Sequence, residues 1–229
     1  MAADSRLTLT FPDPHFSDPN NPDTKHFISV PQTDATRKLF LVQDRIGISV
    51  CGNAVIGNVP ISGFIQSFIL TLRKDVSVEE TAEELLKYFV KMNPKLVTYF
   101  HVAGYSEINA ERVTELWFVS ISENQKLLSI DRGQQGGRWN GELDIINRLF
   151  LPVYLKDQKG DYQPLFHPGI PMNFLTLQDA IDLAIFAVRT TIDTMRFQTR
   201  LPTVGGPIDI LVIEPEHGRW LQNKEPKVR

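Results

Sequence analysis

Apolar residues recur along the chain with two different periods, which predict a mixture of strands and helices. Two short β-branched runs, at 38–42 and 46–51, are separated by three polar residues, and this spacing predicts a tight hairpin. Four more strands are expected farther along, over 96–103, 115–121, 126–130 and 208–213. Turns are expected at 104–107 and at 123–124, where glycine and polar residues interrupt the apolar pattern.

Helical spacing of apolar residues appears in four other segments. Residues 61–72 are apolar around most of the circumference, which predicts a helix that is buried or packed in an interface. A capping box over 77–80 opens a second helix, and a similar N-terminal signal over 176–179 opens the longest one. A short helix is expected over 141–150.

Segments rich in proline, glycine and short polar residues separate these elements. We expect a long surface loop at 11–34 and a second irregular loop at 155–173, because proline removes backbone donors and fixes φ. The predicted strands cluster rather than alternate with helices, which favours an α+β fold built in layers over a doubly wound parallel sheet. We interpret residues 1–229 as a single domain of this kind.

Composition narrows the classes of function. The formal net charge is −3, and lysine and arginine are scattered, so the chain offers no field for nucleic acid. No apolar run has the eighteen or so residues of a membrane-spanning helix. Cys51 is the sole cysteine, which excludes an intrachain disulfide framework and fits a reducing compartment. These features together predict a cytoplasmic protein that binds neither nucleic acid nor membrane.

Most polar residues that resemble site residues have an ordinary structural interpretation. Cys51 ends an apolar run with no histidine nearby in sequence, so it is interpreted as a small buried apolar residue. The glycine-rich stretch 133–137 lacks the lysine and hydroxyl of a phosphate-binding loop. No metal-ligand spacing connects the five histidines, which are His15, His26, His101, His167 and His217. We therefore expect no metal and no other cofactor.

Three segments occur in an order that carries a resemblance. They are Ala2-Ala3-Asp4-Ser5-Arg6, then 37–52 with its Arg-Lys-Leu-Phe start and its Cys-Gly end, and finally Gly205-Gly206-Pro207-Ile208-Asp209. Between them, the glycine turn at 103–105 and the strand at 116–119 fit the same order. The set resembles the proteasome β-subunit family of N-terminal-nucleophile hydrolases, and the resemblance runs nearly from end to end of the chain.

The resemblance implies both a fold and an activity. The fold would be a four-layer α-β-β-α sandwich, with two antiparallel sheets face to face and helices outside. The activity would be threonine-type hydrolysis of peptide bonds in peptide or unfolded protein substrates, performed by a homo-oligomeric ring. The matching catalytic lysine is Lys38, the aspartate that orients it is Asp4, and the oxyanion glycine is Gly52. Arg6 would be structural.

This sequence departs from the family pattern in two respects. The nucleophilic threonine is expected about a dozen residues before Asp4, so residues 1–6 are interpreted as the end of a strand that begins upstream of Met1. Leu201 and Val204 stand where the family has a second aspartate and a serine. The chain as written is therefore expected to be inactive.

Three hypotheses follow from these observations. The first is a peptidase whose full-length form carries the nucleophile. The second is a non-catalytic, ring-forming or scaffold subunit with the same fold, which the missing nucleophile, Leu201 and Val204 all favour. The third is an unrelated α+β ligand-binding domain, which requires the ordered motifs to be coincidental.

Overall fold

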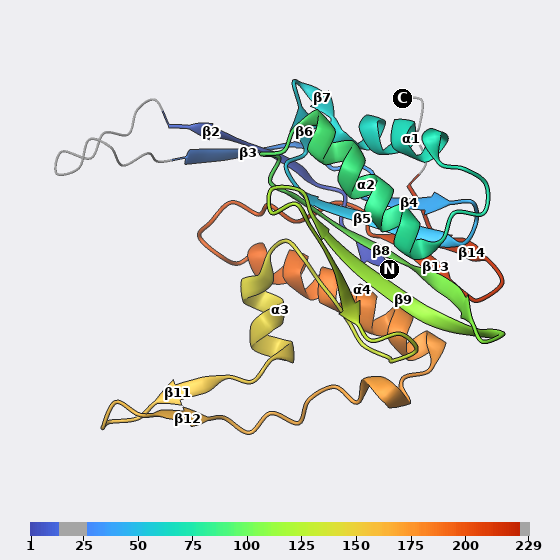
Figure 1. Cartoon of the computed structure of the whole chain (residues 1–229). Helices are drawn as coiled ribbons and strands as arrows, with labels where there is room; N and C mark the ends of the chain where they lie inside the picture. Colours follow the sequence, from blue (N-terminus) through green and yellow to red (C-terminus); the bar gives the residue numbers. More distant parts are fainter. Residues whose placement is uncertain (14–26, 225–229) are drawn as a thin grey trace.

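The computed structural model describes residues 1–13 and 27–224. Within them the chain is a mixed α/β protein with four α-helices and several antiparallel sheets, the largest of five strands. Helices α1 (Ile61–Thr71) and α2 (Val78–Met92) lie on one side of that sheet, while α3 (Leu143–Phe150) and α4 (Leu177–Met195) lie on the other (Figure 1).

The five-stranded sheet has the order β10-β9-β8-β5-β4, and every neighbouring pair is antiparallel. Its strands are β4 (Leu39–Val42), β5 (Ile46–Gly52), β8 (Thr98–Ile108), β9 (Glu111–Ser120) and β10 (Gln125–Ile130). The predicted hairpin is confirmed: residues 43–45 join β4 and β5, and Gln43 and Asp44 both have positive φ, as the central residues of a type I′ turn do.

Side-chain alternation along β5 assigns the two faces of this sheet. Ile46, Ile48 and Val50 belong to the core cluster that also contains Ile65 and Phe68 of α1 and Leu85 and Phe89 of α2. The intervening residues of β5 point to the opposite face, where Gly47 lies against Met1 and Leu211. The same alternation along β8 places Phe100 in the core under the helices and His101 on the opposite face.

A second, three-stranded sheet lies against part of that opposite face. It has the order β1-β13-β14, with β1 (Ala2–Ala3), β13 (Asp209–Ile213) and β14 (Gly218–Gln222). Strand β13 contacts β4 and β5, and α4 contacts β1 and β13. Because β1 is an edge strand, the three-stranded sheet ends there and leaves β8, β9 and β10 facing α4 without an intervening strand.

Both segments predicted to be loops contain strands, so those two predictions are wrong in part. In 11–34, β2 (Leu7–Pro12) pairs with β3 (Phe27–Thr33), while residues 14–26 lie outside the described residues. In 155–173, β11 (Tyr154–Lys156) pairs with β12 (Tyr162–Pro164), and a 3-10 turn, η1 (Met172–Phe174), follows. Both hairpins project on the same side of the molecule (Figure 1). Each is a two-stranded sheet, and a two-stranded sheet tolerates proline because both of its strands are edges.

The predicted turn at 104–107 is also wrong, because strand β8 continues through it. Strand β8 ends at Ile108, and the turn is made by Asn109 and Ala110, which both have positive φ. Gly104 lies within the strand, and its lack of a side chain has a packing reason. A Cβ at this position would come within 2.8 Å of the Val78 side chain of α2. The glycine therefore allows helix α2 to pack closely on the sheet, and it does not reverse the chain.

The helix predictions agree with the structure. Ser77 and Glu80 form the predicted capping box at the start of α2, and Thr176 and Asp179 form the one at the start of α4. A small hairpin of β6 (Val55–Ile56) and β7 (Val59–Pro60) precedes α1 and was not predicted. None of the helices in the described part of the chain is long and apolar enough to cross a membrane.

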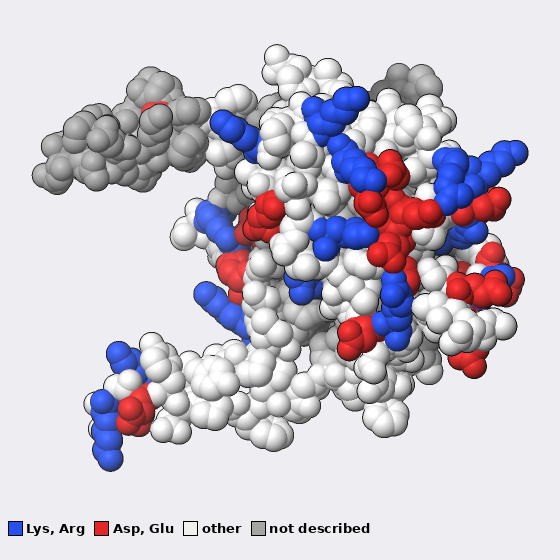
Figure 2. Space-filling view, viewed as in Figure 1, with Lys and Arg blue, Asp and Glu red and all other residues white. Residues whose placement is uncertain are grey.

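Charged side chains of both signs are interleaved over α2 and the neighbouring strands (Figure 2). Glu79 of α2, for example, pairs with Lys126 and Arg132, and Glu83 pairs with Lys87 one turn along the helix. Exposed pairs of this kind contribute little stability individually. They do keep this face free of a concentrated positive patch.

Candidate active site

Two residues predicted to act together, Asp4 and Lys38, form an ion pair. Lys38 Nζ donates a hydrogen bond to Asp4 Oδ1 over 2.7 Å, although 34 positions separate the two residues. Asp4 directly follows β1, and Lys38 directly precedes β4. The side chains are only 11% and 22% exposed, so solvent screens this pair less than a surface pair. The lysine is therefore held in one place by a carboxylate at the junction of the two sheets.

Backbone donors fix the second oxygen of Asp4. Oδ2 accepts hydrogen bonds from the backbone N–H groups of Arg6 and Gly205, each over 3.0 Å. With Lys38, the carboxylate accepts hydrogen bonds from three donors, which fix its orientation. Asp4 thus orients Lys38 and also connects the chain near β1 to the loop before β13.

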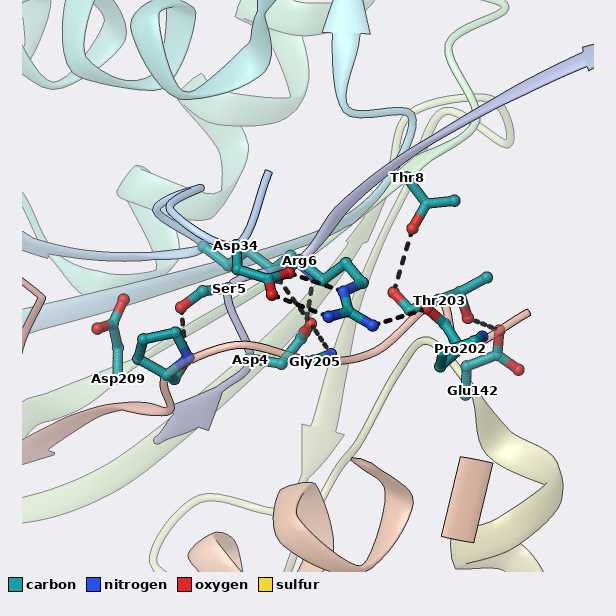
Figure 3. A network of polar contacts seen from close by, with 12 residues as sticks. Asp4, Ser5, Arg6, Thr8, Asp34, Glu142, Pro202, Thr203, Gly205 and Asp209 are labelled. Carbon is teal, nitrogen blue, oxygen red and sulfur yellow. Dashed lines mark hydrogen bonds and ion pairs between the residues drawn. The ribbon is translucent and has the colours of Figure 1, made fainter. Parts of the chain in front are cut away.

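Arg6 has the structural role expected of it. Its Nε and Nη2 donate to the two oxygens of Asp34 over 2.7 and 2.8 Å, and Nη1 donates to the Pro202 carbonyl (Figure 3). The hydrogen bonds from Arg6 lower the pKa of the Asp34 carboxyl. The bidentate pair joins Arg6 to Asp34, and the third hydrogen bond joins it to Pro202, so Arg6 connects three distant segments of the chain.

Gly52, the third predicted residue, lies at the end of β5 in a conformation that favours glycine. Its φ is +108°, and a Cβ there would collide with the Val97 carbonyl and lie 2.9 Å from the Thr98 Cα. Gly52 lines the same cavity as Asp4 and Lys38, so the fold brings all three predicted site residues to one place.

That cavity has a volume of about 880 Å³ and lies between the five-stranded sheet and α4. Lys38, Asp4 and Gly52 line it together with Met1, residues 134–142 and one face of α4. Lys38 Nζ has Asp4 as its one hydrogen-bond partner within residues 1–13 and 27–224, so its other N–H groups are unused. A cation with free donors at a concave site can stabilise an anionic or developing negative group.

No model of a protein family matches this chain, and no curated protein matches it. The grouping of Asp4, Lys38 and Gly52 therefore depends on the geometry alone.

Of the two positions that depart from the family pattern, one lines the cavity. Val204 lines the cavity, while Leu201 is 41% exposed. The nitrogen of Met1 lies in the ladder of the three-stranded sheet, where it donates to the Leu211 carbonyl over 2.6 Å. Burial lowers the pKa of this amine to about 6. The Met1 nitrogen is therefore used in strand pairing.

Burial also affects Cys51, which lines the cavity beside Gly52. The pKa of its thiol is raised by burial, more than the nearby Lys38 lowers it. The thiol is thus held in its neutral form. This agrees with the prediction that Cys51 packs rather than reacts, although the residue is half-buried rather than fully buried.

Sequence reasoning missed one polar pair inside the cavity. His101 of β8 is buried, and its Nδ1 lies 3.4 Å from the Ser49 Oγ of β5. Its Nε2 is buried and has no hydrogen-bond partner among the residues that the structure describes. Burial and, to a smaller extent, the positive charge of Arg138 lower the pKa of His101 to about 4. The alternation of strands β5 and β8 could have placed the pair on one face, but their pairing register was needed to make them neighbours.

A second buried lysine–carboxylate pair was also missed. Lys224 Nζ pairs with the fully buried Asp209 of β13 and donates to Ser5 Oγ over 2.6 Å. The backbone N–H of Lys224 donates to the same carboxylate over 3.0 Å. This network joins residues after β14 to the segment that carries Asp4. It supports the position of the site and is not part of the cavity wall.

Proposed function

We propose that this chain is a proteasome-like subunit of the N-terminal-nucleophile hydrolase class, and that its full-length form cleaves peptide bonds beside Lys38. The observation that carries the proposal is the Asp4–Lys38 ion pair on the wall of a large cavity. An oriented ammonium at a concave site would keep the surroundings of an N-terminal hydroxyl electropositive, while the amine of that same residue acts as the base.

Each residue has a distinct part in the proposed reaction. Asp4 positions Lys38, whose positive charge lowers the pKa of an adjacent hydroxyl and favours its attack on an amide carbonyl. A backbone N–H at Gly52 stabilises the negative charge that develops on the carbonyl oxygen. The amine of the nucleophilic residue takes the hydroxyl proton and passes it to the departing amine product, which leaves an acyl ester. Water then attacks this ester, the same amine takes the proton of the water and returns it to the nucleophile's oxygen, and the acid product leaves. Asp4 and Gly52 are placed in these roles by their resemblance to the family pattern and by their shared cavity.

The proposed fold is the four-layer sandwich of this family. Support comes from α1 and α2 on the outer face of the five-stranded sheet, from β13 against its inner face, and from α4 against β1 and β13. The two sheets are each antiparallel, as the family pattern requires.

We further propose that the nucleophile is a hydroxyl residue that precedes Met1 in the full-length protein. For the 229 residues alone we expect no turnover, because a thioether cannot attack an amide.

The alternative is a subunit of the same fold that assembles without cutting. Leu201 and Val204 favour it, because neither side chain can transfer a proton. The β11–β12 hairpin adds a further reason, since Tyr154, Tyr162 and Phe166 are 56%, 69% and 93% exposed. Exposed apolar groups of this size are typical of surfaces that associate.

Labelling of the full-length protein with a peptide vinyl sulfone, an electrophile that captures an attacking hydroxyl or thiol, distinguishes the two. Hydrolysis predicts one label at the amino-terminal residue, and Lys38→Met is expected to slow labelling about 100-fold or more. Lys126→Met is the matched control, because Lys126 is also an ion-paired lysine of low exposure (17%) but lies outside the cavity.

Sedimentation of the same samples measures assembly, so that the peptidase and the scaffold function predict different combinations of labelling and assembly. Rings that take no label establish the scaffold function and exclude the peptidase. Labelling at Cys51, or labelling that Lys38→Met leaves unchanged, refutes the roles assigned to Lys38 and Asp4.

A further inference from the structure

Two hairpins project from the body of the molecule on the same side, and we call them the first and second arms (Figure 1). The first arm is β2 with β3, and the second is β11 with β12. Among the described elements, each of these strands makes extensive contacts only with its hairpin partner. A two-stranded sheet is marginally stable in water unless another layer covers its hydrophobic face. The arms lack such a layer, whereas α1 and α2 cover the five-stranded sheet.

The first arm has one apolar face and one polar face. Its apolar face is formed by two cross-strand pairs, Leu9 with Val30 and Phe11 with Ile28. On the other face Thr10 lies opposite Ser29, and their hydroxyl groups hydrogen-bond over 3.0 Å. Phe11, Ile28 and Val30 are 51%, 43% and 44% exposed. A sheet that is apolar on one side is normally buried there against another layer.

The distribution of charge indicates what kind of layer fits this face. Neither strand of the first arm carries a charged residue. Natural proteins commonly place charges on exposed strands to prevent self-association, and this arm has none. In a two-fold contact each side chain approaches the same region of an identical chain, so an uncharged face avoids repulsion. The second arm carries charges of both signs at its turn (Figure 2), and they are Lys156, Asp157, Lys159 and Asp161.

The second arm brings the exposed apolar area to that of a stable interface. Its exposed apolar side chains are Tyr154, Leu155, Tyr162, Leu165 and Phe166. At roughly 150–200 Å² for a large apolar side chain, the exposed fractions of the two arms amount to roughly 700–900 Å² per copy. A typical specific interface buries about 800 Å² on each partner. The first arm alone would supply only about a third of this area.

We propose that the two arms form a docking surface for a second copy of this chain. The apolar face of the first arm packs against the same face of the partner around a two-fold axis, so that each hairpin supplies the layer that the other lacks. The second arm extends the contact to the area of a stable dimer. Thr10 and Ser29 remain on the solvent side of the first arm.

This contact is separate from the proposed hydrolysis and from the closure of a ring. A ring closes through head-to-tail contacts between two different surfaces, whereas a two-fold contact joins one surface to itself. The arms include neither Asp4 nor Lys38. Failure of the vinyl sulfone labelling would therefore leave the dimer in place, and failure to form the dimer is observed without any activity measurement.

Sedimentation of the 229-residue protein over a series of concentrations tests the proposal. Phe11→Asp places a carboxylate from each copy in the apolar contact, and we expect it to raise the dissociation constant of the dimer about 100-fold or more. Thr10→Asp is the matched control, because it places the same charge on the neighbouring residue of the opposite face. It is expected to change the dissociation constant by less than about threefold.

The second arm is tested by truncation of an exposed aromatic side chain. Phe166→Ala, at a position that is 93% exposed, is expected to raise the dissociation constant about tenfold. Phe174→Ala is the control, because Phe174 is 85% exposed but lies in η1, outside both arms. It is expected to leave the dissociation constant unchanged.

Cross-linking gives a second measurement that does not require a charge in the contact. In a Cys51→Ala background, a protein with one introduced cysteine can be linked by a short bismaleimide only to the same residue of another copy. Val30→Cys, on the apolar face, is expected to form covalent dimers about tenfold faster than Thr10→Cys on the polar face, because the dimer holds the two thiols at a high effective concentration. Both positions are exposed in the single chain.

Three results would overturn the proposal. One is a protein that remains monomeric at about 100 μM, since the arms would then stay open or be covered by a different molecule. Another is a dimer with the same dissociation constant in the Phe11→Asp and Thr10→Asp proteins. The third is equal cross-linking of the Val30→Cys and Thr10→Cys proteins, because the dimer would then use another surface.

Discussion

Replacing His101 by glutamine is expected to make the stability of the protein less sensitive to acid. Burial lowers the pKa of His101 from about 6.5 to about 4, with a smaller contribution from Arg138. Between these two pH values the unfolded chain binds a proton that the folded chain does not. The free energy of unfolding therefore falls as the pH falls from about 6.5 toward 4.

The size of this effect follows from the shift in pKa. A difference of about 2.5 units at 1.36 kcal/mol per unit corresponds to about 3 kcal/mol of stability that is present above pH 6.5 and lost near pH 4. Glutamine does not titrate, so the His101→Gln protein should lack this part of the profile. The Met1 amine, whose pKa is lowered to about 6, affects the free energy of unfolding at higher pH, between about 8 and 6. The substitution of His101 is expected to leave this contribution unchanged.

Urea unfolding at closely spaced pH values from 4 to 8, followed by tryptophan fluorescence, measures the effect directly. His217→Gln serves as the control, because His217 is exposed and its substitution is expected to leave the profile as it is. If the His101→Gln and unsubstituted proteins lost the same free energy between pH 6.5 and 4, the explanation by a buried neutral histidine would be wrong.

Three further substitutions test the core, the site and a helix end. Leu85→Ala should lower the free energy of unfolding by about 2–5 kcal/mol, because Leu85 is fully buried, whereas Leu70→Ala, at 87% exposure, should change it by less than about 0.5 kcal/mol in the same urea titration. Gly52→Ala should cost about 2–4 kcal/mol, from the positive φ and the collision with Val97, and unchanged thermal stability would contradict the local geometry. Ser77→Ala should cost about 1 kcal/mol by calorimetry, and a Ser77→Asp variant that failed to recover most of it would contradict the capping assignment.

Local signals predicted those elements whose formation is decided locally. In the capping boxes at 77–80 and 176–179, every hydrogen bond joins residues that are three positions apart. Sequence alone therefore indicated where α2 and α4 begin. The Gln43–Asp44 hairpin turn lies between two apolar runs, which makes it equally local. Gly104 failed as a turn signal because its reason is distant: helix α2 approaches the strand there through Val78.

The candidate site was predictable only as far as the ordered motifs extended. Asp4, Lys38 and Gly52 were expected to lie together, and they line one cavity. The backbone N–H of Gly205, the second fixed donor to Asp4, could not be named, because 201 positions separate the two residues. Lys224 and Asp209 were missed for another reason: β14 was not predicted, so no turn brought them together.

The contact between Arg6 and Gly205 has a consequence for sequence variation. A Cβ at Gly205 would lie 2.5 Å from the Cζ of Arg6, so the guanidinium occupies the volume that any other residue at 205 would need. A natural variant with alanine at 205 should therefore carry a shorter residue at position 6, and it would lack the ion pair with Asp34. Positions 6 and 205 are expected to change together during evolution, and an alignment that shows them varying independently would mean that this crowding is relieved elsewhere.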